Sequence, residues 1–217
     1  MTIAKTETLV IQAPKLETAE FIIISTAPYV MAKFSNKAKQ QMRDKHEAGS
    51  TAKKTKRDAR DFHQDFLESQ HVAMEGWNGF HAGGLRQAFI SACRLVNFKM
   101  TLAKMSIFVL ADGFDRDEGT PLIRLYGDPA QQVEHMVRNA TGVADIRVRA
   151  MFRNWYSKIR VRYDADQFKS QDIANLLMRV GEQVGLGEGR PDSKASAGMG
   201  WGTFRIADAD EAAQLEF

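Results

Sequence analysis

The feature that most constrains the fold is an alternation of residue types in the segment DIRVRAMFRNWYSKIRVRY, residues 145–163. Ile146 and Val148 alternate with arginines before residues 153–154, and the same alternation follows them. Because successive side chains of a strand point to opposite faces, the pattern predicts two antiparallel strands with one apolar and one basic face. The basic face would carry arginines, with aromatic residues beside it: Arg147, Arg149, Arg160, Arg162, Trp155 and Tyr156.

Helix and strand patterns alternate along the rest of the chain. Further strands are expected in 19–34 (interrupted at Pro28), 105–114, 120–127 and 201–206, and helices in 35–49, 82–96 and 170–184. Ser35 and Gly49 have the residue types that cap the two ends of the first helix. The order of the elements predicts an α+β domain with antiparallel sheets over residues 19–206. A flexible arm, 1–18, would precede it and an acidic tail, 207–217, would follow.

Charge is distributed unevenly along the chain, although the net charge of +3 is small. Ten basic and three acidic residues lie between Lys33 and Arg60, and six basic and no acidic residues between Ile146 and Tyr163. Basic segments of this kind point to an anionic partner. The segment 35–60 is expected to be a helical, lysine-rich insertion whose loop becomes ordered on a partner, through Lys53, Lys54, Lys56 and Arg57.

The chain has a single cysteine, Cys93, which excludes an intramolecular disulfide and a multi-cysteine zinc site. The first residues lack the charged start and apolar run of a signal peptide, and FIIIS is the longest aliphatic stretch. These features predict a soluble protein of a reducing cytoplasm, without a membrane partner.

No motif of a common enzyme class is present in the sequence. The chain lacks a Walker A motif, a GxGxxG after a strand, an HExxH and a nucleophile elbow. The five histidines stand alone, so no metal site, cofactor or catalytic residue is predicted. For His81, which precedes a Gly-Gly helix start, two roles remain open: a general acid/base near a phosphate, and structural hydrogen bonding. An acidic cluster lacks the spacing of a calcium loop and is expected to be a solvated turn: Asp112, Asp115, Asp117 and Glu118.

A cluster of glycines lies in the segment VGLGEGRPDSKASAGMGWGTFRI, residues 184–206. Such a cluster indicates positive φ angles or the close approach of another group. Two interpretations remain open: a loop that admits a phosphate chain, and a plain mobile loop. The glycines are Gly185, Gly187, Gly189, Gly198, Gly200 and Gly202.

Two segments together resemble the RAMP superfamily. GFHAGGLRQAFISACR, residues 79–94, resembles the early RAMP motif, in which a short glycine or serine turn leads through Leu-Arg or Leu-Lys into a helix that ends in Arg. GLGEGRPDSKASAGMGWGTFRI, residues 185–206, resembles the terminal glycine-rich loop of these proteins and its closing strand. The superfamily includes the backbone subunits of CRISPR effector complexes, which polymerise along guide RNA, and processing endoribonucleases. The layout is also similar to small single-domain proteins encoded by tailed phages.

The resemblance implies an RRM-like or ferredoxin-like fold and a non-catalytic protein of a bacterial host cell's cytoplasm. This protein would bind single-stranded RNA or DNA and self-associate along the strand, as a homo-oligomer or filament. Two alternatives remain open: a metal-independent processing-type endoribonuclease that uses His81, and a phage protein that mimics a subunit of a host RNA-guided complex and meets a host or phage protein partner. The residues expected to contact nucleic acid are His81, Gly83, Gly84, Arg86, Arg147, Arg149, Arg160, Arg162, Gly187, Gly189, Arg190, Lys194, Gly198, Gly200, Lys53, Lys54, Lys56 and Arg57.

Overall fold

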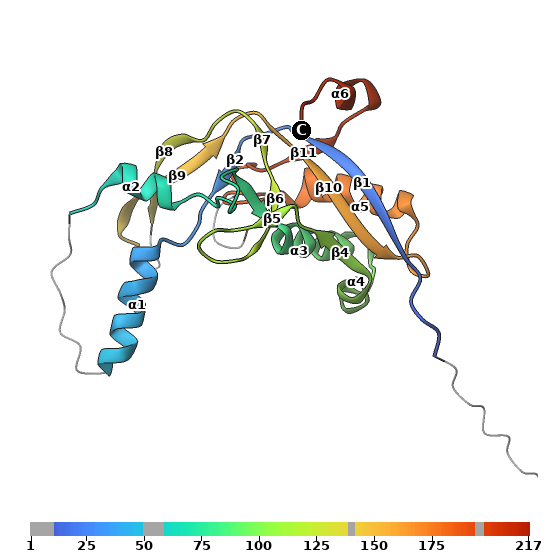
Figure 1. The fold of residues 1–217 in the computed structure, drawn as a ribbon, viewed down its shortest axis with the longest axis horizontal. Helices are drawn as coiled ribbons and strands as arrows, with labels where there is room; N and C mark the ends of the chain where they lie inside the picture. Colours follow the sequence, from blue (N-terminus) through green and yellow to red (C-terminus); the bar gives the residue numbers. More distant parts are fainter. Residues whose placement is uncertain (1–10, 50–58, 139–141, 194–197) are drawn as a thin grey trace, which may run out of the picture.

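The largest sheet runs in the order β11-β1-β10-β4, with the short β7 paired to the start of β10. It belongs to a computed structural model that describes residues 11–49, 59–138, 142–193 and 198–217 (Figure 1). The chain is α+β with antiparallel sheets, as the sequence predicted. The strands of this sheet are β1 (Leu16–Ser25), β4 (Ile107–Leu110), β7 (Tyr126–Gly127), β10 (Trp155–Asp164) and β11 (Phe204–Ile206).

Two helices lie in the connections between strands of this sheet. All neighbouring strands are antiparallel, so β4 runs parallel to β1 on the far side of β10, and β11 runs parallel to β10 on the far side of β1. α3 (Ala82–Cys93) lies between β1 and β4 in the chain, and α5 (Ser170–Arg179) between β10 and β11. The helices contact each other and the sheet, and the core between them includes Ile23, Phe89, Ile159, Leu177 and Phe204.

β9 (Ala144–Phe152) and β10 are the two strands that the alternation predicts, but the prediction that they form one basic face is wrong. In the described structure β9 pairs with β2 (Tyr29–Met31) and β8 (Gln131–Arg138), whereas β10 pairs with β1, β4 and β7. An alternating pattern determines which face of a strand is buried, but it does not determine which strand pairs beside it. β1 pairs with β10 along almost its whole length. Arg147 and Arg149 therefore lie in a different sheet from Arg160 and Arg162.

A third sheet has the order β3-β6-β5. It consists of β3 (Gly79–His81), β5 (Gly113–Phe114) and β6 (Pro121–Arg124). His81 of β3 and Gly113 of β5 are both opposite Leu122 of β6, and an isolated bridge joins Ala73 to Asp115. These pairings bring the start of α3, the segment before β3 and the turn after β5 to one place.

The expectation that Trp155 offers a stacking surface is wrong. Its side chain is 1% exposed, and its indole N–H donates to the carbonyl of Ala27 at 3.0 Å. Tyr156, the next residue, stacks on Tyr126 with the ring centroids 5.4 Å apart, and Phe217 lies edge-on to both rings. Trp155 is therefore a core residue. Successive side chains of β10 point to opposite faces of the sheet, and Trp155 is on the buried face.

The first peripheral helix follows the sequence closely. α1 (Asn36–Ala48) is capped by Ser35, whose side chain accepts a hydrogen bond from the amide of Ala38, and it ends at Gly49, as predicted. It stands away from the sheets (Figure 1). The remaining helical segments are α2 (Phe62–Glu68), a 3-10 turn (Arg94–Val96), α4 (Met100–Ser106), a π turn (Val180–Val184) and α6 (Ala209–Ala213). Of these, α4 and α6 lie where no helix was predicted. None of the helices in the described parts of the chain has the length and apolar character needed to cross a membrane.

The ends of the predicted domain carry regular structure. β1 begins at Leu16, inside the range assigned to an arm, and α6 lies inside the range assigned to an acidic tail. The tail is anchored by the hydroxyl of Tyr156, which donates to the carbonyl of Glu216 at 2.7 Å.

Candidate functional site

The start of α3 and the glycine-rich loop, which are far apart in the chain, meet at one cavity. The cavity has a volume of about 390 Å³, which falls in the usual range of small-ligand sites. Its lining includes His71, His81 and Gly84 from around the start of α3, and Gly185, Gly187 and Arg190 from the loop. The two segments that resemble RAMP motifs are thus neighbours in space.

The first turn of α3 has no side chain covering it at two successive positions. His81 is the N-cap residue, but its side chain makes no capping hydrogen bond, so the amides of this turn are not satisfied by their cap. Gly83 and Gly84 are exposed and have no positive φ. A Cβ at Gly83 would meet nothing within 4 Å, and one at Gly84 would lie 3.6 Å from His81 Cβ, an ordinary contact. The fold therefore does not require glycine at either position.

The glycine-rich loop differs, because the fold itself requires several of its glycines. All six have φ between 65° and 76°. A Cβ at Gly187 would lie 2.5 Å from the carbonyl oxygen of Val30, and one at Gly189 would lie 2.5 Å from the ring of Trp201. The group that approaches closely at these positions is the chain itself. At Gly200, by contrast, a Cβ would meet nothing within 4 Å.

Positive charge at the cavity comes from Arg190, whose guanidinium donates to the carbonyl of Gly187 at 3.0 Å. Two acidic residues that also line the cavity are paired with arginines from outside it. Glu188 pairs with Arg149 of β9, and Asp192 pairs with Arg94 at 2.9 Å. The loop side of the cavity is therefore suited to an anion.

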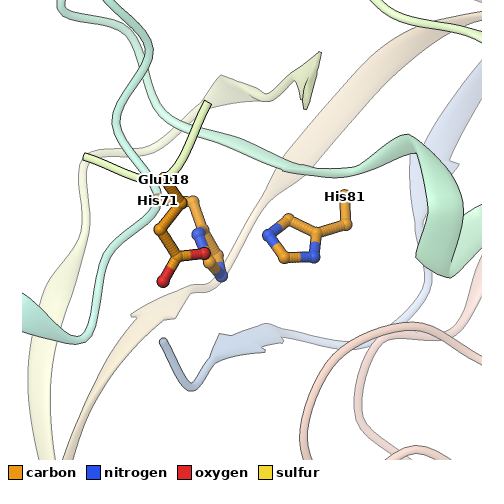
Figure 2. A group of neighbouring side chains, drawn as sticks. All are labelled: His71, His81 and Glu118. Carbon is orange, nitrogen blue, oxygen red and sulfur yellow. The ribbon is translucent and has the colours of Figure 1, made fainter. Parts of the chain in front are cut away.

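Two histidines form the opposite wall. The ring centroids of His71 and His81 are 4.1 Å apart, and Figure 2 shows both side chains with Glu118 beside them. The pairings around β6 bring these residues together. The sequence prediction treated each histidine as solitary and so missed His71.

Asp115 organises this wall. The prediction that it lies in a solvated turn is wrong, because the residue is 1% exposed. Its carboxylate lies 2.9 and 3.1 Å from Lys33 Nζ and 3.0 Å from His71 Nδ1. It also accepts from the amides of Asp117 and Glu118, at 2.9 and 3.0 Å. These bonds hold residues 115–118 in the turn that carries Glu118 to the histidines.

The ionisation of this wall follows from the same contacts. Burial acts to raise the pKa of Asp115, but the hydrogen bonds from Lys33, the two turn amides and His71 outweigh it and lower this pKa to about 2. Burial and the neighbouring His81 lower the pKa of His71, against the opposing effect of Asp115. At neutral pH the wall therefore contains an ionised Asp115 and a neutral His71.

Several predicted contact residues are engaged elsewhere. Arg86 donates to the backbone carbonyls of Lys104 and Ile107 and so completes the C-terminal end of α4. Arg160 pairs with Asp112 at 2.8 Å. Arg162 and Arg147 lie in separate sheets. The exposed Arg162 lies over the ring of Phe108, with its guanidinium 5.5 Å from the ring centroid, and the half-buried Arg147 lies opposite His135. Gly83, Gly189, Gly198 and Gly200 are outside the cavity lining. Lys53, Lys54, Lys56, Arg57 and Lys194 lie outside the described residues.

One sequence signal could have revealed the buried wall. Lys33 stands in the apolar run YVMAKF, and a lysine inside such a run needs a buried acidic partner. The partner's identity has no local signature, because Asp115 lies 82 residues away.

Neither a protein-family model nor a curated protein matches the chain. What the site can do chemically therefore follows from its loop side, with Arg190, and from the opposite wall, with His71 and His81. Backbone amides and a guanidinium are donors for an anion such as a phosphate group. Imidazoles next to a carboxylate can exchange protons or bind a metal ion.

Proposed function

We propose that the protein binds single-stranded nucleic acid, with RNA as the first candidate, at the cavity between α3 and the glycine-rich loop. The observation that carries the proposal is the bare first turn of α3. Gly83 and Gly84 leave it uncovered although the fold does not require glycine there; of the two, Gly84 lines the cavity, and Arg190 lines it from the glycine-rich loop. A phosphate chain needs such an approach to backbone amides. Self-association along the strand, as in the backbone subunits that the sequence resembles, is part of the proposal.

The topology of the main sheet supports this interpretation. We infer that the order β11-β1-β10-β4, with α3 and α5 in the two connections, corresponds to the β-α-β-β-α-β arrangement of ferredoxin-like and RRM-like domains. The two smaller sheets and α1 would then be additions to that core.

The first experiment asks whether nucleic acid binds at all. The protein is purified at low salt, its absorbance ratio at 260 and 280 nm is recorded, and binding of labelled single-stranded RNA and DNA is measured in EDTA. We expect retained nucleic acid and a salt-dependent affinity, falling with a log–log slope of about 0.7 per neutralised phosphate. Protein free of nucleic acid that binds neither labelled strand would contradict the proposal.

A second function is favoured by one observation, the His71–His81 pair with Asp115 behind it. Such a pair suits acid–base cleavage of RNA without a metal ion. This alternative predicts cleavage of structured RNA in EDTA that is lost in His81→Ala. Intact RNA after incubation with the wild-type protein would exclude it.

A further inference from the structure

We propose that His71, His81 and Glu118 form a binding site for one divalent metal ion of the zinc class. One ligand atom from each residue lies within 4.8 Å of those of the other two. Figure 2 shows the three side chains converging, with the His81 ring directed toward the other two. Two imidazole nitrogens and a carboxylate oxygen are the donor set of zinc sites that keep a fourth position open.

Asp115 gives His71 the orientation that a ligand needs. Its carboxylate faces the Lys33 ammonium and is therefore an acceptor, so the bond of 3.0 Å must be donated by His71 Nδ1. The lone pair of the neutral imidazole is then on Nε2. A carboxylate that holds a histidine in this way is the usual support of a zinc ligand.

The same carboxylate also positions Glu118. Asp115 Oδ1 accepts a hydrogen bond from the Glu118 amide at 3.0 Å, and this bond fixes the backbone from which the Glu118 side chain extends. Lys39 of α1 pairs with Glu118 Oε1, and the carboxylate has a second oxygen to offer a metal ion. One residue thus supports two of the three ligands.

The three ligand atoms must move closer when a metal ion binds. Around a tetrahedral ion at about 2.1 Å, ligand atoms are about 3.4 Å apart, so the side chains close by rotation about their χ angles. His81 is half-buried and Glu118 is on a turn, which leaves room for this movement. Nε2 of His81 lies 3.3 Å from Thr120 Oγ1, a weak hydrogen bond that a bound metal ion could replace.

The open position would lie at the cavity, because His71 and His81 both line it. A water molecule or a phosphate oxygen of a bound strand is the ligand of the right chemistry. This inference goes beyond nucleic-acid binding, which needs no metal ion. It competes with the metal-independent nuclease alternative, since His81 bound to a metal ion cannot also carry a proton.

The experiment uses untagged, full-length protein stripped with EDTA and then dialysed free of chelator. Co²⁺ is titrated and followed by its visible absorption, and Zn²⁺ is then added as competitor. We expect one tightly bound Co²⁺ per chain, displaced by Zn²⁺, and an affinity at least tenfold lower in His81→Ala and in Glu118→Gln. His63→Ala, which changes an exposed histidine outside the cluster, is the matched control and should bind as the wild type does.

The outcomes separate cleanly. Absence of a Co²⁺ spectrum in the wild-type protein, or unchanged affinity in both His81→Ala and Glu118→Gln, would overturn the metal site. Loss of binding in His63→Ala alone would do so too. Circular dichroism and melting temperature verify that the variants are folded, and RNA binding in EDTA is scored separately, so failure of one proposal leaves the other standing.

Discussion

The ammonium of Lys33 lies 2.9 and 3.1 Å from the two carboxylate oxygens of Asp115, and the two side chains are 2% and 0% exposed. Lys33 follows β2 and Asp115 follows β5, so the pair ties two different sheets together. The same carboxylate holds His71 at the cavity wall. Lys33 also pairs with Asp117 at 2.7 Å, so the stability of the fold and the geometry of the site both depend on this cluster around the Lys33 ammonium.

Replacing Asp115 with Asn should lower the free energy of unfolding by about 1–3 kcal/mol, because it removes one of the two carboxylates that pair with the buried Lys33 ammonium and leaves Asp117, at 2.7 Å, as the other. Urea unfolding at neutral pH measures the loss. Asp192→Asn is the control, since its pair with Arg94 is partly exposed and should contribute less than about 1 kcal/mol. Equal losses in the two variants would refute the importance given to the buried pair.

Acid should remove the contribution of Asp115 in a defined range. Its folded-state pKa of about 2 is below the ordinary value of 3.8, so the stabilisation is complete above pH 4 and is lost as the pH falls toward 2. The wild type should lose about 2 kcal/mol more over this range than Asp115→Asn does. Denaturant unfolding at several pH values checks this, and parallel pH profiles for the two proteins would show that Asp115 titrates normally.

The sequence predicted the elements with strong local signals, but not β8, α4 or α6. Ser35 and Gly49 bound α1 as expected, and α3, α5 and β11 lie where periodicity placed them. Alternation could not tell that β9 and β10 belong to different sheets, since strand pairing depends on distant partners.

The site was predictable only in part. Residues of both glycine motifs were expected to contact nucleic acid, and both motifs contribute to the cavity. The wall formed by His71, Asp115 and Lys33 depends on pairings among β2, β3, β5 and β6, which no local pattern encodes. Arg86 is predicted to contact nucleic acid, whereas its guanidinium donates to backbone carbonyls at the end of α4.

Two glycines of the loop should respond differently to alanine. Both have positive φ, which strains any other residue, but only Gly187 also has Val30 and Tyr29 against it. Gly187→Ala should therefore lower the free energy of unfolding by about 1–3 kcal/mol more than Gly200→Ala. Chemical denaturation of the two variants compares them directly. Equal destabilisation would mean that the loop does not pack on β2 as described.

The salt dependence of RNA binding should identify the arginine that contacts phosphate. Arg190 lines the cavity, whereas Arg160 lies on β10 of the main sheet and is paired with Asp112. Arg190→Gln should reduce the log–log salt slope by about 0.7, one phosphate contact, while Arg160→Gln leaves it unchanged. Fluorescence anisotropy at several salt concentrations gives both slopes. A slope that falls in Arg160→Gln and stays unchanged in Arg190→Gln would instead place the RNA on the main sheet.

The most direct test of the proposed binding site is the RNA affinity of the double variant Gly83→Ala/Gly84→Ala, measured together with its melting temperature. The two methyl groups fit the fold, and alanine favours a helix by up to about 1 kcal/mol per glycine replaced, so the melting temperature should stay the same or rise. Gln171→Ala, in the exposed first turn of α5, is the matched control. We predict that the double variant binds single-stranded RNA at least tenfold more weakly than the wild type and the control. An affinity within twofold of the wild type, in a protein of equal or greater stability, would contradict binding at the first turn of α3.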